Sequence, residues 1–374
     1  MKTYKFKLYQ HKRNKYLHYS INASASIYNH CIALHKRYYR MFGKHLNQYR
    51  LMKHIAKLRK RIKYWQQVGS QAVQDIIQRI EKAYKLFFKQ HQKGTRPPNF
   101  KKRRKYKSFT LKQAGYKFLS GNKIKIGNKL FKFSLSRKIQ GKIKTLTVKR
   151  NKLGELFLLI VTDYQQEHIP VVTGKSAGWD FGLKTFLVGS DGTEIKSPLF
   201  FNQLRNKLKA ANRSLSKKKK GSNSWHKAKD HLNRVHELIA HKRHDWFWKL
   251  AHQLTDTYDV LIFETLNLKG MQRLWGRKIC DLAFATFLEI LQTVATNKGK
   301  LVHFIDRWYP SSKTCSHCGY INHELSLRDR TWDCAGCNTK KILRDRNAAM
   351  NIHRVGASTL RLGDVSLSQT AISV

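Results

Sequence analysis

Two pairs of cysteines constrain the folding of this chain more than any other feature of its sequence. Each pair has two residues between its members and fifteen residues separate the pairs; the four are Cys315, Cys318, Cys334 and Cys337. Four thiolates at this spacing suit tetrahedral Zn²⁺, with each pair forming a tight turn around the ion. The cysteines fill all four positions, so the neighbouring His317 and His323 are not needed as ligands. The sequence predicts one structural zinc in a zinc ribbon, and reduced thiols of this kind suit the cytosol.

A second constraint lies at Val172–Asp191, where apolar residues alternate between glycine and serine at both ends. This pattern predicts a strand that enters a hairpin, with Asp191-Gly192 as the turn. Asp180 stands in the middle of the strand, where acidic residues are disfavoured. A bound cation would compensate for its charge; an ion pair with a nearby lysine is the alternative. Gly178 and Gly182 share the face of Asp180, so they leave room for a ligand or another backbone.

The net charge restricts the partners of the chain. It has 75 lysines and arginines against 22 acidic residues, a formal net charge of +53. Such an excess repels itself unless a polyanion is bound, and a long nucleic acid is the expected partner. A membrane-surface or merely soluble basic protein is the alternative, but the charge is spread along the whole chain. No apolar run approaches the ~20 residues of a membrane span, and Met1–Lys5 lacks the apolar segment of a secretory signal.

The N-terminal half predicts a small barrel that carries a helical insertion. Residues 1–9 alternate between apolar and basic, which indicates a strand. From about residue 12 to 93 the apolar period is helical, and Gly69-Ser70 opens the last helix of this basic bundle. Glycine and paired prolines at Lys93–Phe100 mark a boundary, and the densest basic run, Lys101–Lys107, follows. Short strands then recur between residues 108 and 163; the first strand must join them to form the barrel.

The C-terminal half alternates helices and strands, which predicts an α/β domain with a central sheet. After the hairpin the expected elements are a helical region over 201–257 with a basic loop at Ser216–Ser224, a strand at Val260–Phe263, a helix at Ile279–Asn297, a strand at Leu301–Ile305 and a last helix at Ile342–Val355. The cysteines fall between the last strand and the last helix. The zinc ribbon is therefore an insertion in this domain.

Three acidic residues on separate elements could meet at one point of this sheet. Glu264 closes its strand at the carboxyl end, where α/β sheets place ligands. Asp345 lies near the start of the last helix, and Ala348 and Ala349 are small enough to bring that helix close to the sheet. A cluster of carboxylates is costly without cations, and two Mg²⁺ about 3.5–4 Å apart would support attack of water on a phosphodiester. Other acidic residues are expected to be structural: Asp163, Asp191, Asp259, Asp281, Asp306 and Asp329.

Five segments together resemble TnpB, the family of transposon-associated RNA-guided nucleases. They are Arg96–Arg104, Gly178–Lys184, Glu264–Met271, Asp306–Gly319 and Arg344–Ile352. The second, third and fifth are similar to the three RuvC motifs of the family, and the fourth to the segment that enters its zinc finger. The resemblance covers residues 1 to about 355. Two positions depart from the family pattern: Leu343 stands where an acid is frequent, and Asn338 where glycine is usual.

The resemblance implies a multidomain α+β protein with an RNase H-like RuvC domain. Expected boundaries are 1–11 and 94–172 for a wedge-like β-barrel, 12–93 for a helical recognition domain, 173–310 and 341–355 for the RuvC-like domain, 311–340 for the zinc ribbon and 356–374 for a disordered tail. It implies Asp180, Glu264 and Asp345 as catalytic residues that bind two catalytic Mg²⁺. A guide RNA, a double-stranded DNA target with a short adjacent motif, a prokaryotic cytoplasm and a monomer are also expected. Base pairing would supply the sequence specificity, because the chain has few base-reading devices of its own.

Several basic and amide side chains are candidates for nucleic-acid contact: Gln71, Gln74, Arg79, Lys101, Lys102, Arg103, Arg104, Lys217 and Lys218. The first three lie on a helix that we expect to read the motif next to the target. Solvation of the basic runs is the alternative. The function could also be that of a catalytically inactive RNA-guided repressor, or of a DNA transposase, since the RNase H fold serves both nucleases and transposases.

Overall fold

The computed structural model describes residues 1–164, 172–326 and 328–361. They form two compact units, Met1–Gln165 and Gln166–Val374, which are described separately. Among the described residues, no helix combines the length and the apolar character needed to cross a bilayer.

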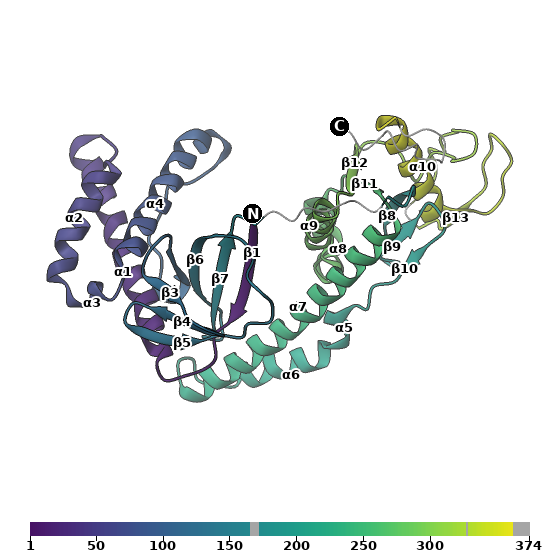
Figure 1. The fold of residues 1–374 in the computed structure, drawn as a ribbon. Coiled ribbons are helices and arrows are strands. Elements are labelled where there is room, and N and C mark those ends of the chain that lie inside the picture. The colour runs from purple at the N-terminus through teal and green to yellow at the C-terminus, as the bar shows by residue number, and fades with distance from the viewer. Residues whose placement is uncertain (165–171, 327, 362–374) are drawn as a thin grey trace. The chain divides into compact units, whose positions relative to one another are not determined.

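The N-terminal unit contains helices and two small antiparallel sheets (Figure 1). Its helices are α1 (Asn14–Phe42), α2 (Gln48–Arg61), α3 (Lys63–Gln66) and α4 (Ser70–Gln90), with short 3₁₀ turns η1 (His91–Lys93) and η2 (Arg103–Lys105). Its strands are β1 (Lys2–Lys7), β2 (Ser108–Leu111), β3 (Tyr116–Phe118), β4 (Lys123–Ile126), β5 (Lys129–Lys132), β6 (Ile143–Arg150) and β7 (Leu156–Thr162).

Strand β1 pairs with β7, as the sequence predicts for the first strand. The larger sheet has the order β1-β7-β6-β2, and Tyr4 and Phe6 of β1 stand opposite Ile160 and Leu158 of β7. The exposed Lys5 and Lys7, which follow Tyr4 and Phe6, point to the other face because strand side chains alternate. The sequence predicts one barrel, whereas the strands divide between this sheet and a second one, β3-β4-β5, joined by the single bridge of Leu8 and Phe133.

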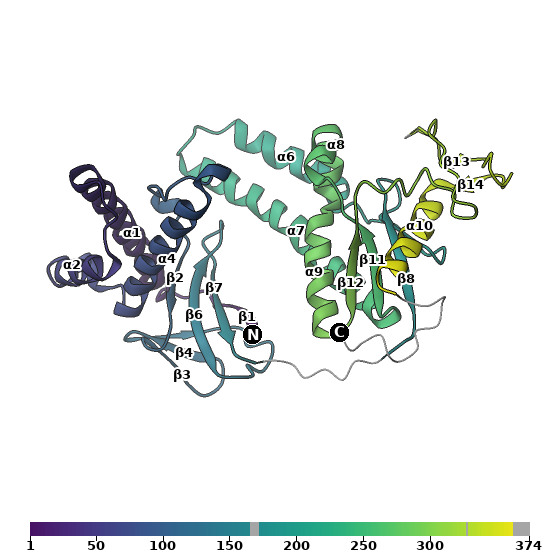
Figure 2. The ribbon, with the colours of Figure 1, turned by 90° about the horizontal axis from the view of Figure 1, so that it is seen from above.

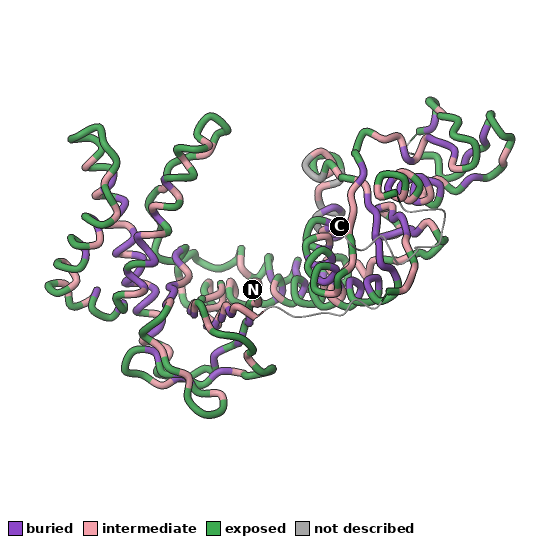
Figure 3. The backbone as a smooth tube through the Cα atoms, turned by 45° about the horizontal axis from the view of Figure 1, so that its top comes forward, coloured by how far each residue is buried: buried purple, intermediate pink, exposed green. Residues whose placement is uncertain are grey.

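The helices of this unit share a core with the sheets. One cluster of buried side chains includes Ile27 and Cys31 of α1, Ile76 of α4 and Phe109 of β2. Figure 3 shows the buried stretches where the helices meet the strands, while the turns at the helix ends are exposed. The predicted barrel and helical domain are therefore one compact unit, because the apolar stripes of α1 and α4 cover apolar faces of the strands.

The C-terminal unit is built on a mixed sheet. Its strands are β8 (Ser176–Phe181), β9 (Leu187–Gly189), β10 (Glu194–Ile195), β11 (Val260–Glu264), β12 (Leu301–Ile305), β13 (Thr331–Trp332) and β14 (Ile342–Leu343). Its helices are α5 (Phe200–Gln203), α6 (Arg205–Ser216), α7 (Asn223–Thr257), α8 (Leu268–Leu282), α9 (Phe284–Asn297) and α10 (Arg344–Thr359). The main sheet has the order β10-β9-β8-β11-β12; β8, β11 and β12 are parallel, and β9 and β10 continue as the predicted hairpin.

The two faces of this sheet carry different residues. Trp179 of β8 and Phe263 of β11 pack on one face in a core shared with α7 and α9. Ile262 points to the opposite face, where it meets Ile352 of α10. Figure 2 shows β11 and β12 between α9 and α10. The sheet is therefore covered on both faces, which explains why its strands read as nearly continuous apolar runs.

Two predicted helix boundaries are wrong. The helix expected over Ile279–Asn297 is two helices, because Ala283 has a φ of 47° and redirects the chain so that apolar residues of both α8 and α9 reach one core. The last helix begins at Arg344 and ends at Thr359, four residues into the predicted tail. Gly356 lies inside it because a side chain there would meet Ile262 at 2.4 Å. The rest of the predicted tail, 362–374, lies outside the described residues.

Candidate functional site: a carboxylate cluster and a four-cysteine centre

Asp180 and Glu264 occupy equivalent positions on two neighbouring parallel strands. The register of β8 and β11 pairs Trp179 with Phe263, so the next residues along each strand are Asp180 and Glu264. Both side chains turn away from the core that holds Trp179 and Phe263, because alternate residues face opposite sides of a sheet. Neighbouring strands lie about 4.8 Å apart. The sheet therefore brings these two carboxylates together at its carboxyl edge, on the face covered by α10.

Helix α10 brings Asp345 to the same edge. A side chain at Gly178 would lie 2.4 Å from the carbonyl oxygen of Ala349 and 2.4 Å from the backbone nitrogen of His353. The helix backbone thus rests directly on β8, the close approach that the sequence predicts for Gly178. Asp345 lies in the first turn of α10, one turn before Ala349. That turn lies toward the end of β8 that carries Asp180, and the helix N-terminus favours negative charge there.

The carboxyl groups repel one another. Burial, followed by the charges of Asp345 and Glu264, raises the pKa of Asp180 to about 7, against a smaller lowering by Arg344. Burial also raises the pKa of Glu264, although the Ser311 hydroxyl donates a hydrogen bond to Glu264 Oε2 at 3.1 Å. The negative charge of the carboxylates is therefore not balanced by nearby cations at Asp180, although the chain as a whole has a large cationic excess.

These carboxylates fit hard divalent cations. Oxygen ligands are those that Mg²⁺ prefers, and a site with one or two carboxylates leaves room for waters and phosphate oxygens. In the described part of the chain the three acids are not drawn into one compact cage, since the four cysteines are the only group of three or more metal-ligating residues whose ligand atoms all lie within 4.8 Å of one another. Asp345 Oδ1 also has a cationic neighbour, Arg330 Nη1, at 3.6 Å. The cluster is open, as a site for a polymeric phosphodiester needs to be.

A cavity of about 550 Å³ adjoins Glu264. Its lining combines that acid with Lys313 and Arg344, and with Trp308, whose residue is 77% exposed. The guanidinium of Arg307 lies 4.7 Å from the centre of the Trp308 ring. An exposed aromatic beside cations fits a base and its phosphates. The sequence interpretation missed Trp308 and Ser311, although both belong to the segment Asp306–Gly319 that carries the family resemblance.

The four cysteines converge in the segment between β12 and α10. Cys315 Sγ lies 3.8 Å from Cys337 Sγ, and Cys318 Sγ lies 3.5 Å from Cys334 Sγ. Thiolates around one Zn²⁺ at about 2.3 Å would be separated by about 3.8 Å, so the spacing fits a tetrahedral site. The five cysteines whose side chains are described form no disulfide. This Cys₄ cluster fits a structural zinc, and neither His317 nor His323 belongs to it.

Backbone turns shape this centre as zinc ribbons require. The Gly319 N–H donates to the Cys315 carbonyl at 2.9 Å, and the Cys334 N–H donates to the Thr339 carbonyl at 2.9 Å. Gly319 has a φ of 81° and Asn338 a φ of 56°. Asparagine is among the few non-glycine residues that tolerate this left-handed conformation. The asparagine that departs from the family pattern therefore still forms the turn.

Two buried asparagines connect this segment to the carboxylate cluster. Asn347 and Asn351 of α10 donate to the Thr314 carbonyl at 2.7 and 2.6 Å. Asn347 also accepts from the Ser316 N–H at 2.8 Å, next to the Cys315 thiol. The helix that carries Asp345 thus also holds the first cysteine pair. Sequence reasoning missed both asparagines, which stand in the segment Arg344–Ile352.

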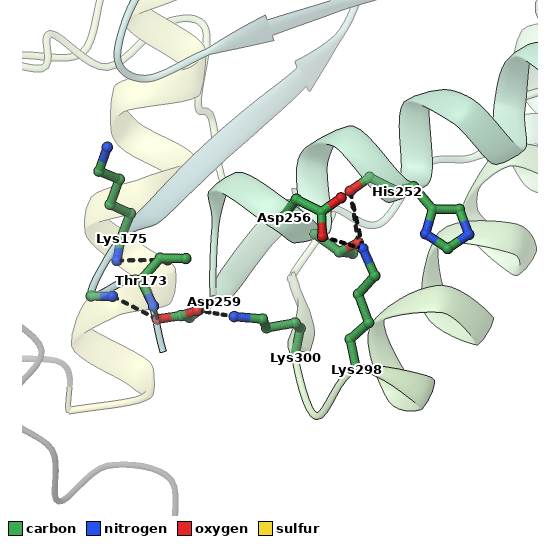
Figure 4. A network of polar contacts seen from close by, with 9 residues as sticks. Thr173, Lys175, His252, Asp256, Asp259, Lys298 and Lys300 are labelled. Carbon is green, nitrogen blue, oxygen red and sulfur yellow. Dashed lines mark hydrogen bonds and ion pairs between the residues drawn. The ribbon is translucent and has the colours of Figure 1, made fainter. Parts of the chain in front are cut away.

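The other acidic residues have structural partners, as the sequence predicts. Asp259 accepts hydrogen bonds from the Thr173 and Gly174 N–H groups at 2.8 and 2.7 Å and pairs with the buried Lys300, so it ties the start of β8 to β12 (Figure 4). The remaining five each accept a backbone N–H: Asp163 from Lys142, Asp191 from Thr193, Asp281 from Phe201, Asp306 from Trp308 and Asp329 from Ser326. The alternative for Asp180, an ion pair with a lysine, is not formed in the described structure.

All the candidate nucleic-acid residues are exposed except Gln71, which is partly exposed, and some of the exposed ones also have partners within the N-terminal unit. The guanidinium of Arg79 lies 2.6 Å from Asp75 Oδ2 and donates to Thr110, which gives it a role within the unit. Lys101 lies 4.7 Å from the Tyr28 ring centre. Arg103 and Arg104 line a cavity of about 420 Å³ with Arg150 and Lys152.

Comparison with known proteins follows this geometry. The family model OrfB_IS605, described as "Probable transposase", matches residues 159–274, and the model "Cas12f1-like, TNB domain" matches residues 284–352. A Streptomyces pristinaespiralis protein named "Putative RNA-guided DNA endonuclease" is 28% identical over 80% of this chain and 74% of its own. Its Escherichia coli counterpart InsQ, which bears the same description, is 26% identical over 79% and 77%. The mimivirus "TnpB-like protein L79" is 28% identical over 57% of this chain and 43% of its own.

A solved structure shares the fold. Cas12f1, in a cryo-EM complex with sgRNA and target DNA, superposes with a TM-score of 0.60 at 16% identity, over 92% of this chain and 83% of that one. The fold and the two family models define a class of transposase-related proteins that includes Cas12f1-like proteins. Within that class, the family models and the curated relatives support a TnpB-family protein.

Proposed function

We propose that this chain is a transposon-associated, RNA-guided DNA endonuclease that cleaves DNA at Asp180, Glu264 and Asp345. The observation that carries the proposal is the charge balance at Asp180. In a chain of net charge +53, acids from β8, β11 and α10 lie near one another, and burial together with the charges of Asp345 and Glu264 raises the pKa of Asp180 to about 7. Such a shift at an open acidic site is typical of functional centres. The names of relatives that span most of the chain support the same activity.

The finer architecture belongs to this proposal. Strand β8, followed by the antiparallel β9 and β10 and then by the parallel strands β11 and β12 with α10 across them, supports an RNase H-like RuvC domain. The Cys₄ segment between β12 and α10 would be its zinc ribbon. In the N-terminal unit, the sheets would serve as the wedge and the helices as the recognition part. A reducing prokaryotic cytoplasm suits four thiolates that hold zinc.

The residues of the cluster would divide the work of cleavage. Two Mg²⁺, when bound, would activate a water and stabilise the leaving oxygen of a phosphodiester. Asp180 must lose its proton before it can serve as a ligand, and the charges of the other two acids both act on it. Glu264 is held in place by the Ser311 hydroxyl. Lys313 and Arg344 line the adjoining cavity, where they would attract the phosphates of the DNA strand and hold it beside Glu264.

The test begins with the RNA that co-purifies with the protein. One discrete RNA with a constant scaffold and a variable end would define the guide, and DNA matched to that end would be the substrate. Asp180→Ala should lower cleavage with Mg²⁺ by about 10⁴-fold or more, with RNA and DNA binding retained. Asp256→Ala is the matched control, because Asp256 is an exposed acid of the same unit that pairs with Lys298. Equal cleavage by the two variants would refute the assignment of Asp180.

Two other functions remain distinguishable in the same experiment. A transposase is favoured by the description of the first family model, and it would yield products in which the cut end is joined to new DNA. An inactive RNA-guided repressor would bind matched DNA without cutting it, even with the unmodified chain and Mg²⁺. Breaks without joining, dependent on the guide, are the result expected from the endonuclease.

A further inference from the structure

A cavity in the N-terminal unit has no part in the proposed cleavage. It measures about 480 Å³, within the range of small-molecule sites, and lies between α1, α4 and the segment that follows α4. Its lining is dominated by rings: His35 and Tyr39 from α1, His45 after it, Tyr84 and Phe88 from α4, and Pro97. All of these residues belong to one compact unit, so the cavity does not depend on the arrangement of the two units.

The rings form a continuous wall. His35 stacks on His45 with 4.9 Å between ring centres and contacts Tyr84 at 4.8 Å. His45 also meets the Phe88 ring edge-on at 5.6 Å. Its Nε2 lies 3.0 Å from Glu81 Oε2, which fixes the imidazole between the two helices. A preformed wall of this kind offers a planar ligand a stacking surface at little cost in side-chain ordering.

One polar atom in this wall lacks a partner. His35 is only 4% exposed, and its Nδ1 makes no hydrogen bond within the described structure. A buried polar atom that is left unsatisfied destabilises the fold, so native structures rarely keep one without a reason. Its burial keeps the His35 ring fixed in the wall, and such a wall favours a flat ring that stacks over an aliphatic chain.

The surroundings of the cavity are basic. The segments 36–44 and 85–96 contain no acidic residue and eight cationic ones: Lys36, Arg37, Arg40, Lys44, Lys85, Lys89, Lys93 and Arg96. Lys36 itself lines the cavity. Two lining rings remain open to solvent, since Tyr39 is 66% and Phe88 52% exposed. A ligand that has both a flat ring and phosphate groups fits this cavity, because the aromatic side chains can stack on the ring and the cationic side chains can bind the phosphates.

We infer that this cavity binds one unpaired nucleobase of a bound nucleic-acid strand, stacked on the ring wall. The basic residues of the two segments hold the flanking phosphates. Aromatic side chains that take a splayed base are a general means of binding single strands. The inference rests on the proposed function only in making nucleic acid the ligand. The inference concerns binding. The cavity could therefore fail to bind a base while the carboxylates still cleave DNA, and it could bind a base even if the carboxylates do not cleave DNA.

The experiment separates base contacts from phosphate contacts. The full chain, freed of co-purified RNA, is titrated with ten-nucleotide single strands of RNA and of DNA, and with the same strands made abasic throughout. Moderate salt suppresses the phosphate contribution. The ratio of the two dissociation constants, abasic over intact, should be about tenfold for the parent protein and fall severalfold in Phe88→Ala and Tyr39→Ala. Tyr49→Ala, which removes an exposed ring of α2 outside the cavity, should leave the ratio unchanged.

Location is tested with strands that carry 5-iodouracil, which crosslinks to stacked aromatic rings on irradiation. Peptides containing Tyr39, Tyr84 or Phe88 should carry the crosslink, with RNA or with DNA according to the source of the base. Crosslinks confined to other peptides, or an abasic ratio that Phe88→Ala and Tyr39→Ala leave unchanged, would overturn the assignment. The second result would leave a protein segment as the occupant of the cavity.

Discussion

At Gly178 the main chain of one helix lies against the main chain of one strand. A Cβ atom there would approach two backbone atoms of α10 at 2.4 Å, and backbone cannot move aside as a side chain does. Gly178→Ala should therefore push α10 from β8 and destabilise the C-terminal unit by about 1–3 kcal/mol or more. Thermal unfolding of the metal-loaded protein measures this, and cleavage should fall with it because Asp345 moves with the helix.

Gly276→Ala provides the control for that substitution. Gly276 lies inside α8 with nothing within 4 Å of the position a Cβ would take. Alanine favours a helix interior over glycine by roughly 0.5–1 kcal/mol, so this variant should be as stable as the parent or more so. A Gly178→Ala protein with the stability of the Gly276→Ala protein would contradict the close packing of α10 on β8.

His35 makes the stability of the N-terminal unit depend on pH. Burial, then the neighbouring His45, lowers its pKa to about 4 despite the opposing charge of Glu81. Between about pH 4 and 6.5 the unfolded chain binds a proton at His35 that the folded chain does not. The contribution of His35 to the free energy of unfolding should therefore be complete above about pH 6.5. The free energy of unfolding should fall by up to about 3 kcal/mol as the pH drops to 4. Tyr84, on α4, is the other titratable ring packed against it.

Hydrogen exchange in α1 and α4 reports this local stability, once rates are corrected for the intrinsic effect of pH. His35→Gln removes the titrating group and should flatten the pH dependence in these helices. The matched change, His11→Gln, removes an imidazole from an exposed position before α1 and should leave the slope as it is. Equal slopes in the parent and His35→Gln proteins would assign the effect to other groups.

Among the elements, α10 has the largest share in the site. Its first turn carries Asp345, and its next turns carry Asn347 and Asn351, which hold the loop before Cys315. Cys334→Ser should abolish zinc binding and loosen this loop, so cleavage and stability of the C-terminal unit should fall together. Metal analysis of the purified protein should give one zinc per parent chain and almost none in the variant.

His317→Ala tests whether a neighbouring histidine is a zinc ligand. His317 stands between the first two cysteines in sequence yet is absent from the group of four close ligand atoms. Its removal should leave one zinc per chain. A loss of zinc in His317→Ala, or full zinc in Cys334→Ser, would show that a histidine replaces one of the thiolates.

At the scale of the whole molecule, the net charge of +53 governs affinity for nucleic acid. Each phosphate that a basic side chain neutralises releases counterions, so affinity falls with a power of the salt concentration. With six or more phosphates bound, RNA affinity should fall about 10³-fold or more between roughly 50 and 200 mM salt. Filter binding across this range measures the slope. A nearly flat response would mean that phosphate contacts contribute little to RNA affinity.

The fold could be predicted from sequence wherever the pattern was local. The alternation of apolar and polar residues predicted β1 and the hairpin of β9 and β10. The helical period of apolar residues predicted α1, α4 and α7. The division of the N-terminal strands into two sheets could not be read in this way, because strand pairing joins residues that are far apart along the chain. Nor could the break at Ala283, since the apolar period continues across it and only the shared core requires the chain to turn.

The sequence by itself determined the chemistry available to this protein: four thiolates at zinc-ribbon spacing, three acids in segments similar to RuvC motifs, and a cationic excess that demands a polyanion. The thiolates and the charge follow from residue type and spacing, and the role of the acids follows from the resemblance to the family; neither needs a fold to be recognised. Only the tertiary structure decided which groups meet. It set Asp180 beside Glu264 through strand register, joined α10 to the cysteine segment through Asn347 and Asn351, and enclosed His35 in a ring-lined cavity. Such contacts depend on which faces pack together, and packing is decided by the whole chain.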